Sequence, residues 1–369
     1  MLDFSSALYL GLRHPNHLLR PWAQLTTGRP AALESPPGAR QVARDLARLQ
    51  GCEWAALGTS TLHIFWDVFE VLAQEPIGIY LDAGTYPIVQ WGVERVAAKG
   101  VRMQAFTRHD PAALDTLLRR DSHLGLRPVV VADGLCPATG RPAPLIEYLN
   151  RVRARRGYLV IDDTQALGIL GHSPGPLAPY GRGGGGTLAW YGLQAPELIV
   201  GSSLAKGFGA PLAVLAGSKS IITRFENDSA TRMHCSPPSA AVISAAEHAL
   251  GVNDTWGDRL RLRLAQLVQR FRKRLRQIGL AASGGLFPVQ TLRPVAAIDA
   301  SGLHAILQES GVRTVLHRAT NGQHARLSFL ITALHTLSDI EQCAEVLGRV
   351  CTFARCQRGG KDREARLHI

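Results

Sequence analysis

The 369-residue sequence has no run of about 18 apolar residues, so no segment of it is predicted to form a transmembrane helix. Its first residues lack the charged and apolar regions of a signal peptide, and a cytoplasmic location is therefore expected. The six cysteines are scattered without the paired spacing of zinc sites, which favours reduced thiols and predicts no metal. No helix-turn-helix, zinc-finger or RNA-binding motif accompanies the net charge of +12, so no nucleic-acid partner is predicted.

Much of the positive charge lies in one segment. Eight basic residues of 259–276 alternate with apolar residues at helical spacing. This pattern predicts an amphipathic helix whose arginines form a solvated outer face. The alternative is a docking surface for an anionic partner such as coenzyme A or an acidic carrier protein.

Strand-like runs alternate with helical segments over the first two thirds of the chain, which predicts an α/β domain with a mostly parallel sheet covered by helices. A long helix, short strands and a last helix near residues 338–347 then predict a smaller α+β domain. We expect an arm at 1–40, the large domain at 41–245, the small domain at 246–355 and a charged, frayed tail at 356–369. The predicted strands are Ile77–Leu81, Val101–Phe106, Pro128–Ala132, Tyr158–Ile161, Leu198–Val200, Leu212–Ala216, Val289–Leu292 and Arg326–Ile331.

One lysine stands between hydroxyl residues and glycines, in the segment Ser202-Ser203-Leu204-Ala205-Lys206-Gly207-Phe208-Gly209. A lysine amine can form a Schiff base with an aldehyde, and serine hydroxyls can bind a phosphate. The acidic pair Asp162-Asp163 ends an earlier strand and offers the carboxylate that a pyridinium nitrogen needs. Together these three groups match pyridoxal phosphate.

Several of these polar residues follow predicted strands directly. Asp82, Asp133, Asp162 and the segment 202–206 all do so, and ligands of parallel sheets bind at the carboxyl ends of strands. The glycine-rich stretch 181–186 is neither a dinucleotide-binding motif nor a P-loop. It is predicted to be a flexible surface loop, with a mobile lid as the less favoured alternative.

Taken together, these motifs resemble the α-oxoamine synthases, fold-type-I pyridoxal-phosphate enzymes that include 8-amino-7-oxononanoate synthase and glycine C-acetyltransferase. The resemblance spans nearly the whole chain. Its motifs are the stretch 4–12, the turn after Leu57, Asp82–Tyr86, Asp133-Gly134, the stretch 162–168, Lys206–Gly209, Ser236-Pro237-Pro238 and the stretch 325–328.

The resemblance implies a role for each matched residue. Lys206 would bond to pyridoxal 5'-phosphate and move protons at the substrate α-carbon, and Asp162 would pair with the pyridine nitrogen. The cofactor phosphate would be held by Ser203, with Ser202, and by the backbone of Gly58 and Thr59 at a helix N-terminus. Tyr86 would stack on the ring, and Ser236 would approach the phosphate of the neighbouring subunit in a homodimer.

The chain departs from the family pattern at four positions. Gln165 replaces a histidine that follows the catalytic aspartate, Pro137 replaces a serine that contacts the cofactor, and Ala7 replaces an asparagine. Ser328 replaces the arginine that grips the amino-acid carboxylate, although Arg326 is kept. Arg313 or Arg318 is the candidate replacement for that arginine.

The leading functional hypothesis is an acyltransferase that condenses an amino acid with an acyl thioester, such as acyl-CoA or an acyl carrier protein, and releases CO2. The runner-up is an aminotransferase or another pyridoxal-phosphate enzyme of the same fold. A non-catalytic relative is the third hypothesis, and the presence of both Lys206 and Asp162 argues against it.

Overall fold

The computed structural model describes residues 1–295, 298–318 and 324–366. It divides into two compact units. The large unit comprises Leu12–Cys136 and Pro142–Asp258; the small unit comprises Met1–Gly11, Pro137–Arg141 and the chain from Arg259 onward. The predicted boundary after residue 245 falls inside helix α9 (Ala240–Gln277), because that helix continues from one unit into the other. The predicted arm is also divided, since its first eleven residues belong to the small unit.

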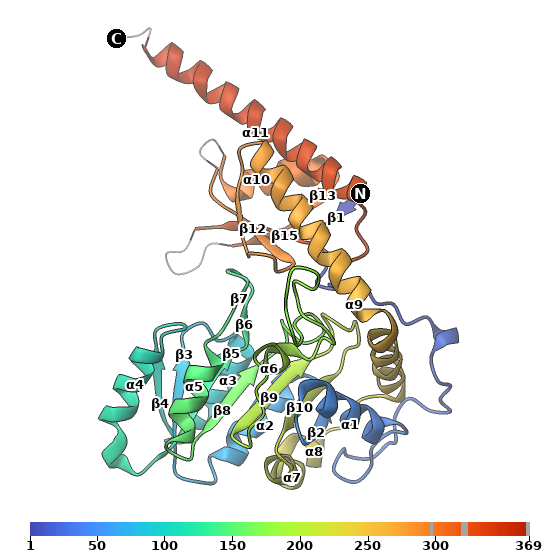
Figure 1. Ribbon diagram of the computed structural model, residues 1–369, viewed down its shortest axis with the longest axis vertical. Coiled ribbons are helices and arrows are strands. Elements are labelled where there is room, and N and C mark those ends of the chain that lie inside the picture. Colours follow the sequence, from blue (N-terminus) through green and yellow to red (C-terminus); the bar gives the residue numbers. More distant parts are fainter. Residues whose placement is uncertain (296–297, 319–323, 367–369) are drawn as a thin grey trace. The chain divides into compact units, whose positions relative to one another are not determined.

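The large unit contains a seven-stranded sheet in the order β2-β10-β9-β8-β5-β3-β4 (Figure 1). Strand β10 is antiparallel to both neighbours and the remaining pairs are parallel, which confirms the predicted α/β class. The sequence did not identify β2, because its short Ala-Ala-Leu core lacks the β-branched residues typical of strands. The strands are β2 (Trp54–Gly58), β3 (Ile77–Asp82), β4 (Arg102–Phe106), β5 (Arg127–Asp133), β8 (Tyr158–Asp162), β9 (Leu198–Ser203) and β10 (Ala213–Gly217).

Helices cover both faces of this sheet. Val129 and Val131 of β5 pack with helices α2, α3 and α7, whereas the alternate residues Val130 and Ala132 pack with α4, α5 and α6. Strands buried on both faces read as continuous apolar runs, which explains why they were predictable from sequence. The helices are α1 (Ala39–Gln50), α2 (Thr61–Leu72), α3 (Pro87–Ala97), α4 (Pro111–Arg120), α5 (Leu145–Arg153), α6 (Gly186–Tyr191), α7 (Lys219–Asp228) and α8 (Ala230–His234), with short elements η1 (Asn16–Leu18), η2 (Ser122–Leu124), β6 (Leu135–Cys136) and β7 (Arg141–Pro142).

The small unit is built on an antiparallel sheet in the order β11-β12-β15-β14. Phe4 follows strand β1 and packs against Phe271 of α9 and Phe329 of β15. Helix α11 continues to Arg366, beyond the predicted end of the last helix near residue 347 and into the predicted tail. Residues 367–369 of the predicted tail lie outside the described residues. The elements are β1 (Leu2–Asp3), β11 (Ala282–Ser283), β12 (Val289–Leu292), β13 (Val312–Arg313), β14 (Val315–His317), β15 (Arg326–Leu330), α10 (Ala300–Glu309) and α11 (Leu337–Arg366).

Several arginines of α9 are buried in the small unit or form hydrogen bonds and ion pairs within it. Arg261 is only 2% exposed, and Arg263 donates hydrogen bonds to two backbone carbonyls at 2.7 and 2.9 Å. Arg272 donates to a carbonyl and to a glutamine side chain, and Arg274 pairs with Glu341 of α11. The predicted solvated arginine face is therefore wrong for Arg261. Arg263, although exposed, and the half-buried Arg272 and Arg274 fasten α9 to the rest of the small unit.

The glycine-rich stretch 181–186 is a packed turn, and the prediction of a flexible surface loop is wrong. Gly184, Gly185 and Gly186 are buried, and Gly186 has a φ of 84°. A Cβ at Gly186 would lie 1.9 Å from Oδ2 of Asp163, so only glycine fits there. The Asp163 carboxylate accepts hydrogen bonds from the backbone and hydroxyl of Thr187 at 2.8 and 2.6 Å. The turn thus holds the second aspartate of the acidic pair inside the large unit.

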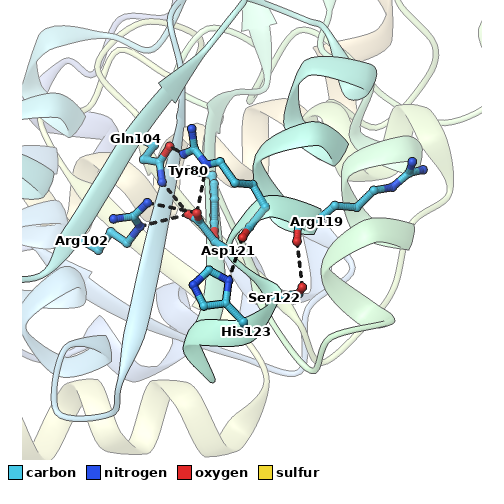
Figure 2. Close-up of polar contacts among 8 residues, drawn as sticks. Tyr80, Arg102, Gln104, Arg119, Asp121, Ser122 and His123 are labelled. Atoms are coloured by element: carbon cyan, nitrogen blue, oxygen red, sulfur yellow. Dashed lines mark hydrogen bonds and ion pairs between the residues drawn. The ribbon is translucent and has the colours of Figure 1, made fainter.

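A polar network fastens the edge strand β4 to the end of α4 (Figure 2). The buried Asp121 carboxylate accepts two hydrogen bonds from Arg102 at 3.0 Å and further ones from Gln104 and Tyr80. Arg120 lies 3.2 Å from the same carboxylate. Hydrogen bonds from Arg102 hold the pKa of Asp121 below its ordinary value despite its burial. The network is structural, because its members belong to β3, β4 and the end of α4 and hold these elements together.

Candidate active site

Two carboxylates end side by side at the carboxyl edge of the large sheet. Asp133 of β5 and Asp162 of β8 are register partners on adjacent parallel strands. Lys206, on the turn after β9, interacts electrostatically with both. The structure thus brings together the lysine and the aspartate that the sequence singled out, together with a second carboxylate that was given no role.

The turn that carries Lys206 is closely packed. The N–H of Phe208 donates to the carbonyl of Leu204 at 3.1 Å. A Cβ at Gly207 would lie 2.4 Å from a backbone oxygen of the facing loop, so glycine is required for this approach. Burial lowers the pKa of Lys206, and the attraction of Asp162 and Asp133 opposes the shift. A lowered pKa increases the fraction of neutral amine, which is the form that attacks an aldehyde.

Asp162 is 7% exposed, and its Oδ1 accepts a hydrogen bond from the N–H of Thr164 at 2.9 Å. Burial raises the pKa of Asp162, while the bonds from Thr164 and the charge of Lys206 lower it. A cationic partner nearby would therefore stabilise the ionised form of this carboxylate. Gln165 lies half-buried on the same turn, three positions after Asp162.

Asp133 fixes the backbone of Tyr86. Its Oδ1 accepts a hydrogen bond from the N–H of Tyr86 at 2.9 Å, at the residue that precedes α3. Burial and the neighbouring charge of Asp162 raise the pKa of Asp133 to about 8. The Tyr86 ring is 51% exposed, and the Lys206 Nζ lies 5.9 Å from its centroid. The aromatic ring predicted to stack on a cofactor therefore lies near the lysine predicted to bind it.

The N-terminus of α2 gathers a second set of predicted residues. Gly58, Thr59 and Ser236 line the same small cavity of about 20 Å³, together with His63. Ser60 caps the helix, and its hydroxyl lies 2.7 Å from the His63 Nδ1, while the Thr59 hydroxyl lies 3.1 Å from the same nitrogen. The exposed Ser236 thus lies beside the helix terminus of its own chain.

Ser202 and Ser203 point to opposite faces of β9. Ser202 is fully buried, and its hydroxyl lies 3.5 Å from the side chain of Gln50 in α1. This corrects the expectation that Ser202 assists in binding a phosphate, because its hydroxyl faces the interior. Ser203 is half-buried, and its backbone donates to the hydroxyl of Thr164 at 3.0 Å.

The two predicted substrate residues lie in the small unit. Arg326 is exposed, whereas Ser328 is fully buried. The Ser328 hydroxyl lies 2.8 Å from that of Thr291 and 2.9 Å from Nε2 of His317. This corrects the assignment of Ser328 as a substrate contact, because both neighbours cover its hydroxyl. Arg313 is exposed, 3.9 Å from the carboxylate of Asp3.

Sequence reasoning missed Ser60, His63 and Thr164, and it gave Asp133 no role. Ser60 was recognisable as a helix cap, because a serine stands directly before an apolar helical run. The contact between Asp133 and Tyr86 joins residues 47 positions apart and leaves no local signal. In the part of the chain that the structure describes, no group of His, Cys, Asp and Glu side chains could hold a metal ion. Among the same residues, no helix is long and apolar enough to cross a membrane.

Known proteins resemble the chain over most of its length. The 8-amino-7-oxononanoate synthase of Citrobacter koseri is 27% identical over 358 residues, covering 94% of this chain and 88% of that protein. The homologous enzyme of Alcanivorax borkumensis is 27% identical over 262 residues, which are 70% of this chain but only 62% of the relative. A serine palmitoyltransferase from S. paucimobilis, solved with bound PLP and myriocin, shares the fold at a TM-score of 0.82 and 16% identity, covering 96% of this chain and 88% of that one.

The model of the family "Aminotransferase class I and II" matches residues 57–347. These residues include the seven-stranded sheet from β3 onward, the Lys206 turn and the sheet of the small unit. The matched segment makes up well over half of the chain, and the fold agrees with it. The protein belongs to the aminotransferase class I and II family.

Proposed function

We propose that the protein is a pyridoxal 5'-phosphate-dependent acyltransferase that condenses an amino substrate with an acyl thioester and releases CO2. The observation that carries this proposal is the buried Lys206 amine. Burial lowers its pKa, Asp162 and Asp133 interact with it electrostatically, and its Nζ lies 5.9 Å from the centroid of the Tyr86 ring. The similarity to 8-amino-7-oxononanoate synthases favours condensation over other reactions of the family.

The residues present fit the cofactor. Asp162 is a buried carboxylate with a raised pKa, and a protonated pyridine nitrogen is the partner that would stabilise its charge. At the N-terminus of α2, the first intrahelical bond runs from Ile64 to Ser60, so the N–H groups of Thr61 and Leu62 precede it and can face an anion. Ser203 adds a hydroxyl. When bound, the cofactor supplies an electron sink for the substrate α-carbon.

Each protein group then has a separate task. Lys206 would hold the cofactor through its amine and would carry a proton to or from the substrate α-carbon. Asp162 would pair with the ring nitrogen, and Tyr86 would cover the ring. Asp133 holds the Tyr86 backbone and thereby sets the position of that ring. Gln165 supplies an amide where the related enzymes carry a titratable histidine.

The amino substrate is expected to differ from a simple α-amino acid. Position 328 carries a buried serine in place of a carboxylate-binding arginine, and the neighbouring exposed arginine at 326 is the remaining cation on β15. A substrate that lacks a free carboxylate, or presents it to Arg326, Arg313 or Arg318, fits this arrangement. The acyl donor is proposed to be an acyl-CoA or an acyl carrier protein, held by the basic residues that α9 leaves exposed, such as Lys273 and Arg276.

Transamination is the second candidate, because the family model includes aminotransferases and because Tyr86 and Gln165 suit either reaction. The two reactions differ in their products. With a panel of amino substrates, acyl-CoA and an α-keto acid as amino acceptor, condensation releases CO2 and free CoA, whereas transamination yields a new keto acid and a new amino acid without either. Formation of a keto acid alone would identify the protein as an aminotransferase.

A homodimer is proposed from the resemblance. Ser236 and Thr59 lie at the surface of the large unit, where a second subunit could complete the phosphate site. Sedimentation of the cofactor-loaded protein tests this, and a fully active monomer would refute it. A purely structural role is tested by the visible absorbance of the purified protein, since a scaffold without cofactor has no visible band.

A further inference from the structure

Two histidines contact each other next to the turn that carries Lys206. His14, which precedes η1, and His248 of α9 both belong to the large unit. Their Nδ1 atoms lie 2.9 Å apart, and their rings are nearly perpendicular at 88°. The other ring nitrogen of His14, Nε2, lies 2.9 Å from the backbone oxygen of Phe208. The three groups form one hydrogen-bonded chain from α9 to the Lys206 turn.

The direction of this chain follows from its last member. A carbonyl oxygen only accepts, so the Nε2 of His14 carries a proton and donates it to Phe208. The Nδ1 of neutral His14 is then an acceptor, and His248 donates to it. One extra proton, on the Nε2 of His248, leaves a single proton between the two Nδ1 atoms and keeps the contact. Two extra protons would place two N–H groups against each other and break the contact.

The surroundings favour the neutral pair. Burial lowers the pKa of His14, the charge of His248 lowers it further, and the bond to Phe208 opposes both effects. Charged groups on the adjoining segments are Arg13 and Arg20 before α1, Glu247 beside His248, and Lys206. Arg20 and Glu247 pair with each other at 2.7 Å, so neither is a free counter-ion for the histidines.

We propose that His14 and His248 are positioning residues that hold the carbonyl of Phe208 and thereby fix the turn on which Lys206 stands. Neither histidine is assigned a contact with cofactor or substrate. The consequence for catalysis rests on the proposed function, but the restraint on the turn does not, because it can be measured directly on the backbone.

Hydrogen–deuterium exchange of the amides in residues 204–212 measures this restraint on the full chain, with and without added pyridoxal phosphate. We expect His14→Ala and His248→Ala each to speed exchange there by about fivefold, the effect of losing one hydrogen bond of ordinary strength. His17→Ala is the matched control, since His17 is an exposed histidine of the same segment. Unchanged exchange in both variants relative to this control overturns the proposal.

A second comparison separates positioning from general loosening. His14→Gln keeps an N–H donor that can reach the Phe208 carbonyl but cannot titrate. We expect it to restore most of the protection lost in His14→Ala. Between about pH 7 and about pH 5, exchange corrected for its intrinsic pH dependence should rise in the wild type and stay flat in His14→Gln. The absorbance of bound cofactor should show the same difference in its pH profile.

These results distinguish this proposal from the proposed function. Faster exchange in the histidine variants of a protein that binds no cofactor would refute the enzyme assignment and support the restraint. Normal exchange in the histidine variants of a protein that binds cofactor and is active would support the enzyme assignment and refute the restraint. Equal pH profiles for the wild type and His14→Gln would overturn the positioning role of the pair.

Discussion

Asp133 and Asp162 are register partners on adjacent strands, so two carboxylates extend from one end of the sheet beside the Lys206 amine. Burial raises the pKa of both aspartates, and the neighbouring charge of Asp162 raises the pKa of Asp133 further. Each carboxylate has a distinct partner, since Asp162 bonds to Thr164 and Asp133 to the backbone of Tyr86. The two aspartates are therefore expected to respond differently to substitution.

Replacement of Lys206 by alanine should abolish covalent attachment of pyridoxal phosphate, because no amine would remain at the end of the site. Borohydride reduction followed by peptide mass spectrometry measures this. The wild type should carry the reduced adduct on Lys206. Lys219→Ala serves as the control, and an adduct retained on another lysine in Lys206→Ala would contradict the assignment.

The Asp162→Asn variant should keep part of its cofactor and lose most of its activity. An amide cannot hold the ring nitrogen protonated, and loss of a charged contact of about 3 kcal/mol corresponds to roughly a hundredfold in rate. Turnover per bound cofactor is the measurement. The exposed Asp254→Asn variant on α9 should behave as wild type. Wild-type turnover in Asp162→Asn would exclude the proposed role.

Asp133 should make the cofactor-free protein less stable as the pH rises. Its pKa of about 8 lies above the ordinary value of an aspartate, so the folded state binds the proton more tightly than the unfolded state. Stability then falls between about pH 4 and about pH 8 as that proton is lost. Denaturant unfolding at several pH values should show a smaller decline for Asp133→Asn. An equal decline in both proteins would mean that Asp133 is not the titrating group.

Asp121 should have the opposite effect on the pH dependence of stability. Its pKa is lowered in the folded state, chiefly by Arg102, so its contribution is present above the ordinary aspartate pKa and is lost on acidification through the lowered value. Asp121→Asn should cost about 1–3 kcal/mol at neutral pH, because Tyr80 and Arg102 lose a charged acceptor. The difference from wild type should shrink in acid. A difference that is independent of pH would rule out the charge as its cause.

Introducing the missing arginine at position 328 should destabilise the protein without improving substrate binding. Ser328 is fully buried between Thr291 and His317, so an arginine there would bury an unpaired charge at a cost of about 3 kcal/mol or more. Ser328→Ala should cost only about 1 kcal/mol. Thermal unfolding and amino-acid binding of both variants provide the measurements. Tighter glycine binding by a stable Ser328→Arg protein would show that the site can open.

The sequence was sufficient to predict the groups placed by local structure. Strands buried on both faces can be recognised in a sequence as continuous apolar runs, and such runs lead to Lys206, Asp162 and Asp133. The burial of Ser328 was not predictable from the sequence, since it depends on Thr291 from another strand and on His317. The same holds for Arg263, whose spacing places it on a polar helix face while its guanidinium donates hydrogen bonds to carbonyls distant in the sequence. Glycine composition suggested mobility at 181–186, but the packing around Asp163 demands glycine there for steric reasons.

The position of strand β1 has a consequence for the order in which the chain can fold during synthesis. Leu2 pairs with Val312, and the carbonyl of Asp3 lies 3.0 Å from Nε2 of His335. These partners leave the ribosome about 300 residues after β1, whereas the large unit is complete by residue 258. The large unit can therefore fold during translation, while residues 1–11 wait for the last third of the chain. A chain that stalls after residue 258 would expose Phe4, Tyr9 and Leu10, and we expect chaperones that bind apolar segments to recognise it there.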